Sequence, residues 1–288
     1  MVYLTKFRYL VLAISIFYEP GSRNHLNCQS TLNSIFTKQS NIYLNNETCR
    51  NNKLISTMLE IGISKIGKKY KAHVLEYDEE GCNLDNLFEF DCVTFIETSL
   101  ALGILQNCNI QNEITYETLI KKLRYKNGNV SGYLSRNHYF SDWIIENEKQ
   151  GIVRNVSKDL NGILYCKNIN FMSNNLKLYP QIKNKEMVKQ LIAIEHSITD
   201  NDIYYIPKSN LSQIQNKINN GDILAFTSNR VGLDVSHVGF AYLIKSKIHL
   251  LHASQKSKIV TISKENLLEY VNKSRDITGL IVARVNYK

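Results

Sequence analysis

The sequence predicts an α+β fold, with helices in the first part of the chain and an antiparallel sheet in the last part. Apolar residues recur at helical spacing as far as about residue 197, and after residue 220 the period becomes strand-like. A hydrophobic content of 43% with only three prolines indicates an ordered core. Helices followed by strands are typical of the α+β class.

The helices are predicted from apolar spacing. The first, 53–66, places Leu54, Met58 and Ile61 on one face. The segment 88–105 is predicted to be a mostly buried helix that begins close to Asp91. Gly151 ends another predicted helix. The remaining segments of this kind are 115–126, 138–150 and 184–197.

The strands are predicted from short apolar runs bounded by turns. The predicted strands are 223–226, 235–244, 248–254, 258–262 and 279–285. A turn at Lys245-Ser246-Lys247 joins the second and third of these strands into a hairpin. A short helix, 264–272, is predicted before the last strand.

The first 50 residues differ from the rest. Lys6 and Arg8 precede a ten-residue apolar run at 9–18, which is too short to span a bilayer but suits a secretory signal. Residues 1–20 are therefore predicted to be a signal peptide, and the alternative is a buried N-terminal helix or strand. Residues 21–50 are expected to be an irregular arm, and 51–288 a single domain. With export the protein is periplasmic or secreted; otherwise it is cytoplasmic.

Charge and cysteines exclude several classes of partner. The net charge of +9 is spread along the chain without a block of like charges, so nucleic acid is not an expected partner. Stable membrane insertion is not expected either, and neither is a cofactor, while a monomer is expected. The six cysteines form no C-x-x-C pair, which argues against a zinc ribbon or a redox motif. After export, Cys28 and Cys49 could form a disulfide.

Cys92 is the candidate nucleophile. It is expected in the first turn of the predicted helix near Asp91, where unpaired N–H groups favour a thiolate. Such an environment can lower a thiol pKa from about 8.5 to roughly 3.5–7.5. Asp91 could cap this helix, although its charge would oppose the thiolate. The alternative is that Cys92 is a small buried hydrophobic residue.

Two histidines are candidates for the base and its partner. His237 lies in one strand of the predicted hairpin, and the turn places His252 opposite position 237 or 239. Because side chains alternate along a strand, His237 and His252 share a face, while His249 points to the other. A second imidazole could then accept from the first and determine its tautomer. Core or surface histidines without catalytic function remain an alternative. A zinc site of Cys92, His237 and His252 is also open, although no compact ligand pair occurs.

Four segments support a catalytic role for these residues: FDCVTF at 90–95, GDI at 221–223, HVG at 237–239 and HAS at 252–254. In this order they resemble the NlpC family of papain-like cell-wall hydrolases. The resemblance implies a Cys that heads a helix, a His on the second strand of the sheet and a polar residue on the third. The expected fold is therefore papain-like, with the nucleophile at a helix start packed on the C-terminal sheet.

Further segments resemble a narrower branch, the N-acetylmuramoyl-L-alanine amidase-like proteins: GKKY at 67–70, FDCVTFIE at 90–97 and YLSRNHYFSDW at 133–143. By this resemblance Tyr70 lines the site. The cluster of Ser135, Arg136, His138 and Tyr139 suits a sugar or a peptide carboxylate; a solvated loop is the alternative. Asp142 and Trp143 are expected to support the structure. Gln255 departs from the serine expected after Ser254, which puts fine specificity in doubt.

This resemblance implies hydrolysis of the amide between N-acetylmuramic acid and L-alanine, with peptidoglycan or muropeptides as partners. Cys92 attacks, His237 acts as the acid and base, and the thioester is resolved by water. A first alternative is an endopeptidase that cuts the γ-D-glutamyl–diamino acid bond. An inactive wall-binding or immunity module of the same fold and a zinc hydrolase also stay open.

Overall fold

The computed structural model describes most of the chain after residue 50. The described residues are 51–76, 80–82, 84, 86–107 and 114–287, and all of them fall in one compact unit. The predicted signal peptide and arm, with Cys28 and Cys49, lie outside the described residues, as does Cys108. The predictions for those segments stay predictions.

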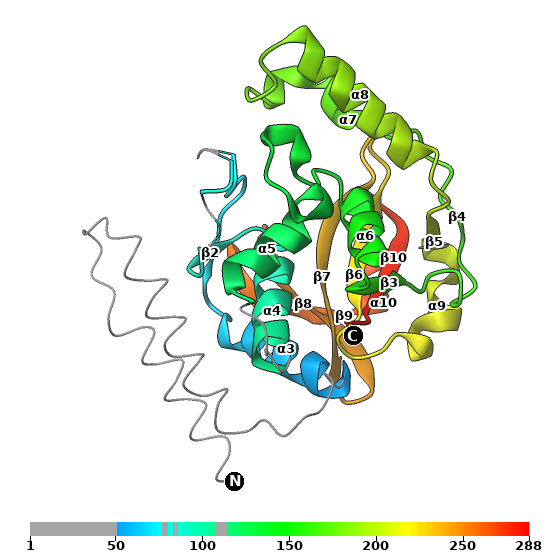
Figure 1. The fold of residues 1–288 in the computed structure, drawn as a ribbon. Helices are drawn as coiled ribbons and strands as arrows, with labels where there is room; N and C mark the ends of the chain where they lie inside the picture. Colours follow the sequence, from blue (N-terminus) through cyan, green and yellow to red (C-terminus); the bar gives the residue numbers. More distant parts are fainter. Residues whose placement is uncertain (1–50, 77–79, 83, 85, 108–113, 288) are drawn as a thin grey trace. The chain divides into compact units, whose positions relative to one another are not determined.

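The described strands form one ten-stranded sheet in the order β2-β1-β9-β8-β7-β6-β10-β5-β4, with β3 paired to β10. Its long strands pair antiparallel with one another: β6 (Ile223–Ser228), β7 (Val235–Ile244), β8 (Lys247–Ser254), β9 (Ile259–Asn266) and β10 (Ile277–Val285). Each of them contains or overlaps a predicted strand. Together with the helices, this sheet confirms the predicted α+β class (Figure 1).

Short strands extend the sheet at positions that were not predicted. They are β1 (Lys69–Tyr70), β2 (Glu89–Phe90), β3 (Val153–Asn155), β4 (Ile163–Leu164) and β5 (Tyr204–Pro207). Segments of two to four residues are too short to show an alternating pattern. Strands β1 and β2 pair in parallel, whereas the other short strands pair antiparallel with their neighbours.

The longer helices agree with the predicted segments to within a few residues. They are α3 (Asn51–Ser64), α4 (Cys92–Asn107), α5 (Tyr116–Arg124), α6 (Phe140–Lys149) and α8 (Lys185–Thr199). Two helices of a single turn, α7 (Phe171–Asn174) and α9 (Leu211–Ile214), were not predicted because they are too short to show a period.

The predicted helix 264–272 begins too early. Residues up to Asn266 complete β9, and α10 is Leu267–Lys273. The boundary falls there because the Asn266 side chain accepts from Glu269 N at 3.2 Å, while Glu269 Oε2 accepts from Asn266 N at 3.2 Å. This reciprocal cap satisfies N–H groups that a helix start leaves unpaired.

Helices cover the two faces of the long strands. On one face α4 packs against α3 so closely that a Cβ on Gly103 would lie 3.0 Å from Met58 Cβ. Phe95 of α4 meets Phe240 of β7 edge to face, with ring centroids 5.8 Å apart. The other face carries a buried cluster that includes Ala241 and Leu250 and also residues of α10. Because side chains alternate along a strand, His237 and His252 share this second face.

Candidate active site

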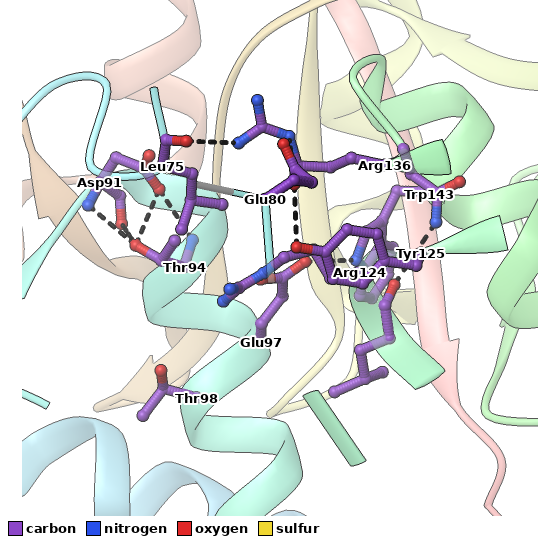
Figure 2. A network of polar contacts seen from close by, with 12 residues as sticks. Leu75, Glu80, Asp91, Thr94, Glu97, Thr98, Arg124, Tyr125, Arg136 and Trp143 are labelled. Atoms are coloured by element: carbon purple, nitrogen blue, oxygen red, sulfur yellow. Dashed lines mark hydrogen bonds and ion pairs between the residues drawn. The ribbon is translucent and has the colours of Figure 1, made fainter. Parts of the chain in front are cut away.

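Cys92 is the first residue of α4 and follows β2 by one residue. Asp91 starts the helix there: its Oδ1 accepts from Thr94 N at 2.8 Å and from Thr94 Oγ1 at 2.9 Å. Thr94 Oγ1 in turn accepts from Asp91 N at 3.0 Å, as Figure 2 shows. The expected capping role of Asp91 is confirmed. The cap also determines where the thiol stands, because it places the first helical turn at Cys92.

The expectation of a lowered thiol pKa is wrong. The pKa of Cys92 is raised to about 12, first by burial of the thiol and then by the negative charge of Asp91. Backbone N–H groups of Val238, Cys92 and Val93 act in the opposite direction but do not outweigh burial. The Val238 contact also places the sulfur beside the backbone that follows His237. The Cys92 side chain is therefore a neutral thiol next to β7.

The hairpin of β7 and β8 brings His237 and His252 together. The register pairs Phe240 with Leu251 and Ala241 with Leu250, and its continuation sets Gly239 opposite His252, one of the two expected positions. A Cβ on Gly239 would lie 2.9 Å from His252 Cβ, so the glycine leaves space for that side chain. His237 Nε2 and His252 Nδ1 are 2.5 Å apart. The expected pairing of two imidazoles on one face is confirmed.

The contact between the rings restricts the tautomers. For His237 to accept a proton at Nδ1, its own hydrogen must stay on Nε2 and be donated to His252 Nδ1. His252 then carries its hydrogen on Nε2. Burial, followed by the charge of His252, lowers the pKa of His237 to about 3, and burial lowers the pKa of His252 to about 4. Both rings are therefore neutral at pH 7, and Nδ1 of His237 can take up a proton.

Aromatic rings surround this histidine pair. Phe226 of β6 stacks on His237 with centroids 6.2 Å apart and an interplanar angle of 16°. Tyr270 of α10 stands edge-on to His252 at 5.9 Å and 90°, and it also contacts Phe226 at 5.3 Å. Tyr270 was not predicted as a site residue. Its only signal in the sequence is a place in the predicted helix after the hairpin, and a spacing pattern does not say which ring that helix meets.

Tyr70 lies on β1, which joins the sheet between β2 and β9. Tyr70 N donates to the carbonyl of Lys258 at 2.8 Å, and the Lys258 ammonium stands 5.9 Å from the ring centroid. The pKa of Tyr70 is raised by burial, then by the charges of Cys92 and Asp91, so the hydroxyl lies within electrostatic range of the thiol. The structure thus brings together Cys92, the histidine pair and two tyrosines, Tyr70 and Tyr270.

The predicted substrate cluster is held by protein groups. Ser135 Oγ donates to Gly132 O at 2.6 Å, and Tyr139 donates to Glu195 Oε1 at 2.6 Å. His138 Nε2 lies 2.7 Å from the carbonyl of Tyr133, and burial lowers the pKa of His138 to about 3. The hydrogen bonds of Ser135, His138 and Tyr139 therefore go to other protein groups. Direct contact of this cluster with a substrate stays a prediction.

Arg136 belongs to the same cluster and is only 5% exposed. Its Nη2 donates to Glu76 Oε1 at 2.6 Å and its Nη1 to the carbonyl of Leu75 at 3.2 Å. Its Nε lies 3.6 Å from Glu80 Oε1 (Figure 2). The guanidinium therefore ties the segment before Cys92 to the 3-10 helix Tyr133–Ser135 and its continuation.

A second buried network lies along α4. Arg124 Nε donates to Glu97 Oε2 at 2.8 Å, and Trp143 Nε1 donates to Glu97 Oε1 at 3.2 Å (Figure 2). Glu97 and Arg124 are 1% and 4% exposed, so this ion pair is internal. Asp142 accepts from Lys126 Nζ at 2.5 Å. The expected supporting roles of Asp142 and Trp143 agree with these contacts.

Two kinds of feature are absent from the described part of the chain. Among its residues, no three His, Cys, Asp or Glu side chains are grouped so that they could hold a metal ion. No helix within the described ranges is both long and apolar enough to cross a membrane.

Comparison with known proteins shows the family. A family model described as N-acetylmuramoyl-L-alanine amidase-like matches residues 60–279. The crystal structure of an N-acetylmuramoyl-L-alanine amidase from Bacteroides uniformis is similar with a TM-score of 0.74 and 32% identity, covering 81% of this chain and 99% of that one. A Bacteroides fragilis protein provisionally named a xylanase gives a TM-score of 0.72 and 35% identity, covering 78% and 100%.

A Legionella pneumophila protein shares the fold, with a TM-score of 0.65 and 20% identity over 90% of this chain and 95% of that one. No curated protein sequence matches the chain. The family match spans the capped helix start, the histidine hairpin and Tyr270. The chain therefore belongs to the N-acetylmuramoyl-L-alanine amidase-like family.

Proposed function

We propose that this protein is a papain-like cysteine amidase that hydrolyses the N-acetylmuramoyl–L-alanine bond of peptidoglycan fragments. The observation that carries the proposal is the 2.5 Å contact between His237 Nε2 and His252 Nδ1, together with the hydrogen bond from the backbone of Val238, the residue after His237, to the Cys92 sulfur. That contact leaves Nδ1 of His237 as the ring nitrogen available to a proton. The substrate is taken from the family and from the amidase of Bacteroides uniformis.

The first half of the proposed reaction starts from a neutral thiol and a neutral imidazole. As the Cys92 sulfur attacks the lactyl carbonyl carbon, a C–S bond forms and the S–H proton passes to His237 Nδ1. The carbonyl electron pair moves to oxygen, where the backbone N–H of Cys92 is a suitable donor. His237 then gives its proton to the L-alanine nitrogen, the C–N bond breaks, and a thioester remains.

The second half regenerates the enzyme. Water attacks the thioester carbonyl while His237 Nδ1 accepts one of its protons. The C–S bond breaks, the proton on His237 returns to sulfur, and the N-acetylmuramic acid carboxyl group leaves and loses its remaining proton to solvent. Throughout, His252 Nδ1 accepts from His237 Nε2, which keeps the ring of His237 in one orientation.

The high pKa of Cys92 distinguishes this proposal from a preformed ion pair. Because burial opposes both the thiolate and the imidazolium, charge develops only as the sulfur attacks. Proton transfer and attack are then expected to be coupled, as in hydrolases with a serine nucleophile. In this proposal Tyr70 lines the site, as the family resemblance implies, and Tyr270 packs against His252. Export to the periplasm or the outside remains part of the proposal, and it rests on residues 1–20.

The test is a muropeptide digest analysed by mass spectrometry. The wild type is expected to release the sugar and an intact stem peptide, and Cys92→Ala to release neither. Cys166→Ala is the matched control, because Cys166 is an exposed free thiol and its loss should leave the rate unchanged. A severed stem peptide would instead indicate an endopeptidase. Binding of muropeptides without turnover by the wild type would indicate a wall-binding module, and release by Cys92→Ala would refute the cysteine mechanism.

A further inference from the structure

We propose that Tyr270 is a positioning residue of this site, whose ring holds His252 in the orientation that receives the His237 N–H and keeps water from the pair. This inference rests on the proposed function and deepens it. Among the described residues no charged side chain hydrogen-bonds to His252, so its ring must be kept in place by something else. The contacts of α10 supply that constraint.

Helix α10 brings Tyr270 to the histidines in a defined way. The cap between Asn266 and Glu269 sets the first turn of the helix, directly after β9. Leu267 and Val271, 2% and 0% exposed, anchor the helix in the core. Tyr270 lies beside Val271 in sequence and packs on the edge of the same core. A helix anchored at both positions leaves the Tyr270 ring little freedom to move.

The rings form a closed arrangement. Tyr270 meets His252 edge to face at 5.9 Å and Phe226 at 5.3 Å. Phe226 stacks on His237 at 6.2 Å, and His237 meets His252 at 4.8 Å. Each histidine thus has one aromatic neighbour and the other histidine. Edge-to-face contacts at these distances are favourable arrangements for aromatic rings, so rotation of His252 would cost a ring contact and a hydrogen bond together.

The surroundings of His252 favour packing over charge as the orienting force. On β7 its neighbour is the neutral His237; on β9 the opposite residue is Thr261, which carries no charge. On α10 it meets the ring of Tyr270, whose pKa is raised to about 12 by burial and by the charges of Cys92 and Glu265. The tyrosine is therefore neutral as well. Burial lowers the pKa of His252.

The experiment compares three variants of the full chain: Tyr270→Leu, Tyr270→Phe and Tyr205→Leu. The phenylalanine keeps the ring and loses the hydroxyl, while the leucine keeps apolar bulk and loses the ring. Tyr205, on β5, is the matched control because it is another half-buried tyrosine. Its ring contacts the ring of Tyr165, with centroids 4.8 Å apart. The readouts are the pH profile of kcat/KM on a muropeptide and the 15N NMR shifts of the His237 and His252 rings.

Tyr270→Leu is expected to lose roughly tenfold in kcat, within the 10²-fold that a misplacement of about 1 Å can cost. The acidic limb of its pH profile should move upward toward about 6.5, because water reaches the imidazoles. Its ring 15N shifts should show mixed tautomers at neutral pH. Tyr270→Phe should keep most of kcat and the wild-type limb, and Tyr205→Leu should keep both.

Two results would overturn the proposal. One is a Tyr270→Leu enzyme with the wild-type pH limb and unmixed tautomers; the other is a loss in Tyr270→Phe as large as in Tyr270→Leu, which would assign the effect to the hydroxyl. The NMR shifts are read on the resting protein, so they do not depend on turnover. If Cys92→Ala hydrolyses muropeptides, the proposed function fails, but the tautomer result still decides whether Tyr270 orients His252.

Discussion

Two polar clusters, the histidine pair and the Arg136 cluster, differ in which polar atoms are left without a hydrogen bond to protein. In the histidine pair, His237 uses Nε2 on His252 and leaves Nδ1 without a hydrogen-bond partner among the described residues. In the Arg136 cluster, the guanidinium donates to Glu76 and Leu75, and Tyr139 donates to Glu195. The first cluster leaves a ring nitrogen of His237 able to accept a proton, whereas the second holds protein segments together.

This difference bears on how dense polar motifs are interpreted. The stretch 133–143 is richer in polar and aromatic groups than either histidine strand, and from sequence it is the more conspicuous binding motif. Buried polar groups must be hydrogen-bonded, however, and the folded chain supplies those bonds internally. A motif of this kind can therefore stabilise the walls of a site without contacting the ligand. Mutations in each cluster test whether the two differ in this way.

The largest effect is expected from His237→Ala. Removing the ring takes away the group that accepts the thiol proton and returns it to the amine, so kcat should fall by roughly 10²–10⁴-fold. The measurement is single-turnover cleavage of a muropeptide, with thermal unfolding to verify the fold. Loss of less than a factor of ten would show that another group acts as the base.

A smaller effect is expected from His252→Ala, up to about 10²-fold in kcat with little change in KM, because His237 loses its hydrogen-bond acceptor and its orientation. His252→Gln keeps a carbonyl acceptor on a side chain of similar length, and it should recover part of the rate. Steady-state kinetics of the pair of variants provide the check. Equal rates for the two variants would contradict an orienting hydrogen bond.

In the Arg136 cluster, Arg136→Met should act on stability more than on catalysis. It removes the donors to Glu76 Oε1 and to the carbonyl of Leu75, while Tyr133 still donates to Glu76 Oε2, so the free energy of unfolding should fall by roughly 1–3 kcal/mol. The kcat/KM of the folded enzyme should change by less than about threefold. Urea unfolding and kinetics measure the two quantities.

Arg154→Met is the matched control for that variant. Arg154 pairs with Asp159 at 2.8 Å, but both side chains are more than half exposed, at 53% and 54%. Pairs of this kind contribute about 0–1 kcal/mol. A kcat/KM loss of 10²-fold in Arg136→Met at unchanged stability would restore Arg136 as a substrate-binding residue.

Stability is also expected to decline with acid. His138 and His237, with pKa lowered to about 3, and His252, with pKa lowered to about 4, bind protons in the unfolded chain from about pH 6.5 downward but not in the folded one. Stability from these groups is complete above that pH and is lost as the pH falls toward 4. Urea midpoints between pH 7.5 and pH 4.5 test this, and His252→Gln should flatten the slope. A midpoint that rises with acid would contradict the burial of these rings.

The parts of the site that were predictable from sequence depend on local rules. Asp91 as a cap, Cys92 at a helix start and the shared face of His237 and His252 follow from capping chemistry and from alternation along a hairpin. The thiol pKa was wrongly predicted, because a helix N-terminus is local whereas burial comes from the whole fold. Tyr270 was missed, and the boundary of α10 was misplaced by a few residues, since neither has a periodic signal.

Local patterns along the chain are sufficient to predict the α+β class, the order of its long elements, and a hairpin that brings His252 opposite position 237 or 239. Each of these depends on neighbours a few residues apart, so spacing and turn chemistry carry the information. Local patterns do not predict three other properties: the neutral state of the imidazoles and the thiol, the place of Tyr270 in the ring cluster, and the contact of Arg136 with Glu76. Burial and contacts between distant segments produce these properties, and they exist only once the helices have packed on the sheet.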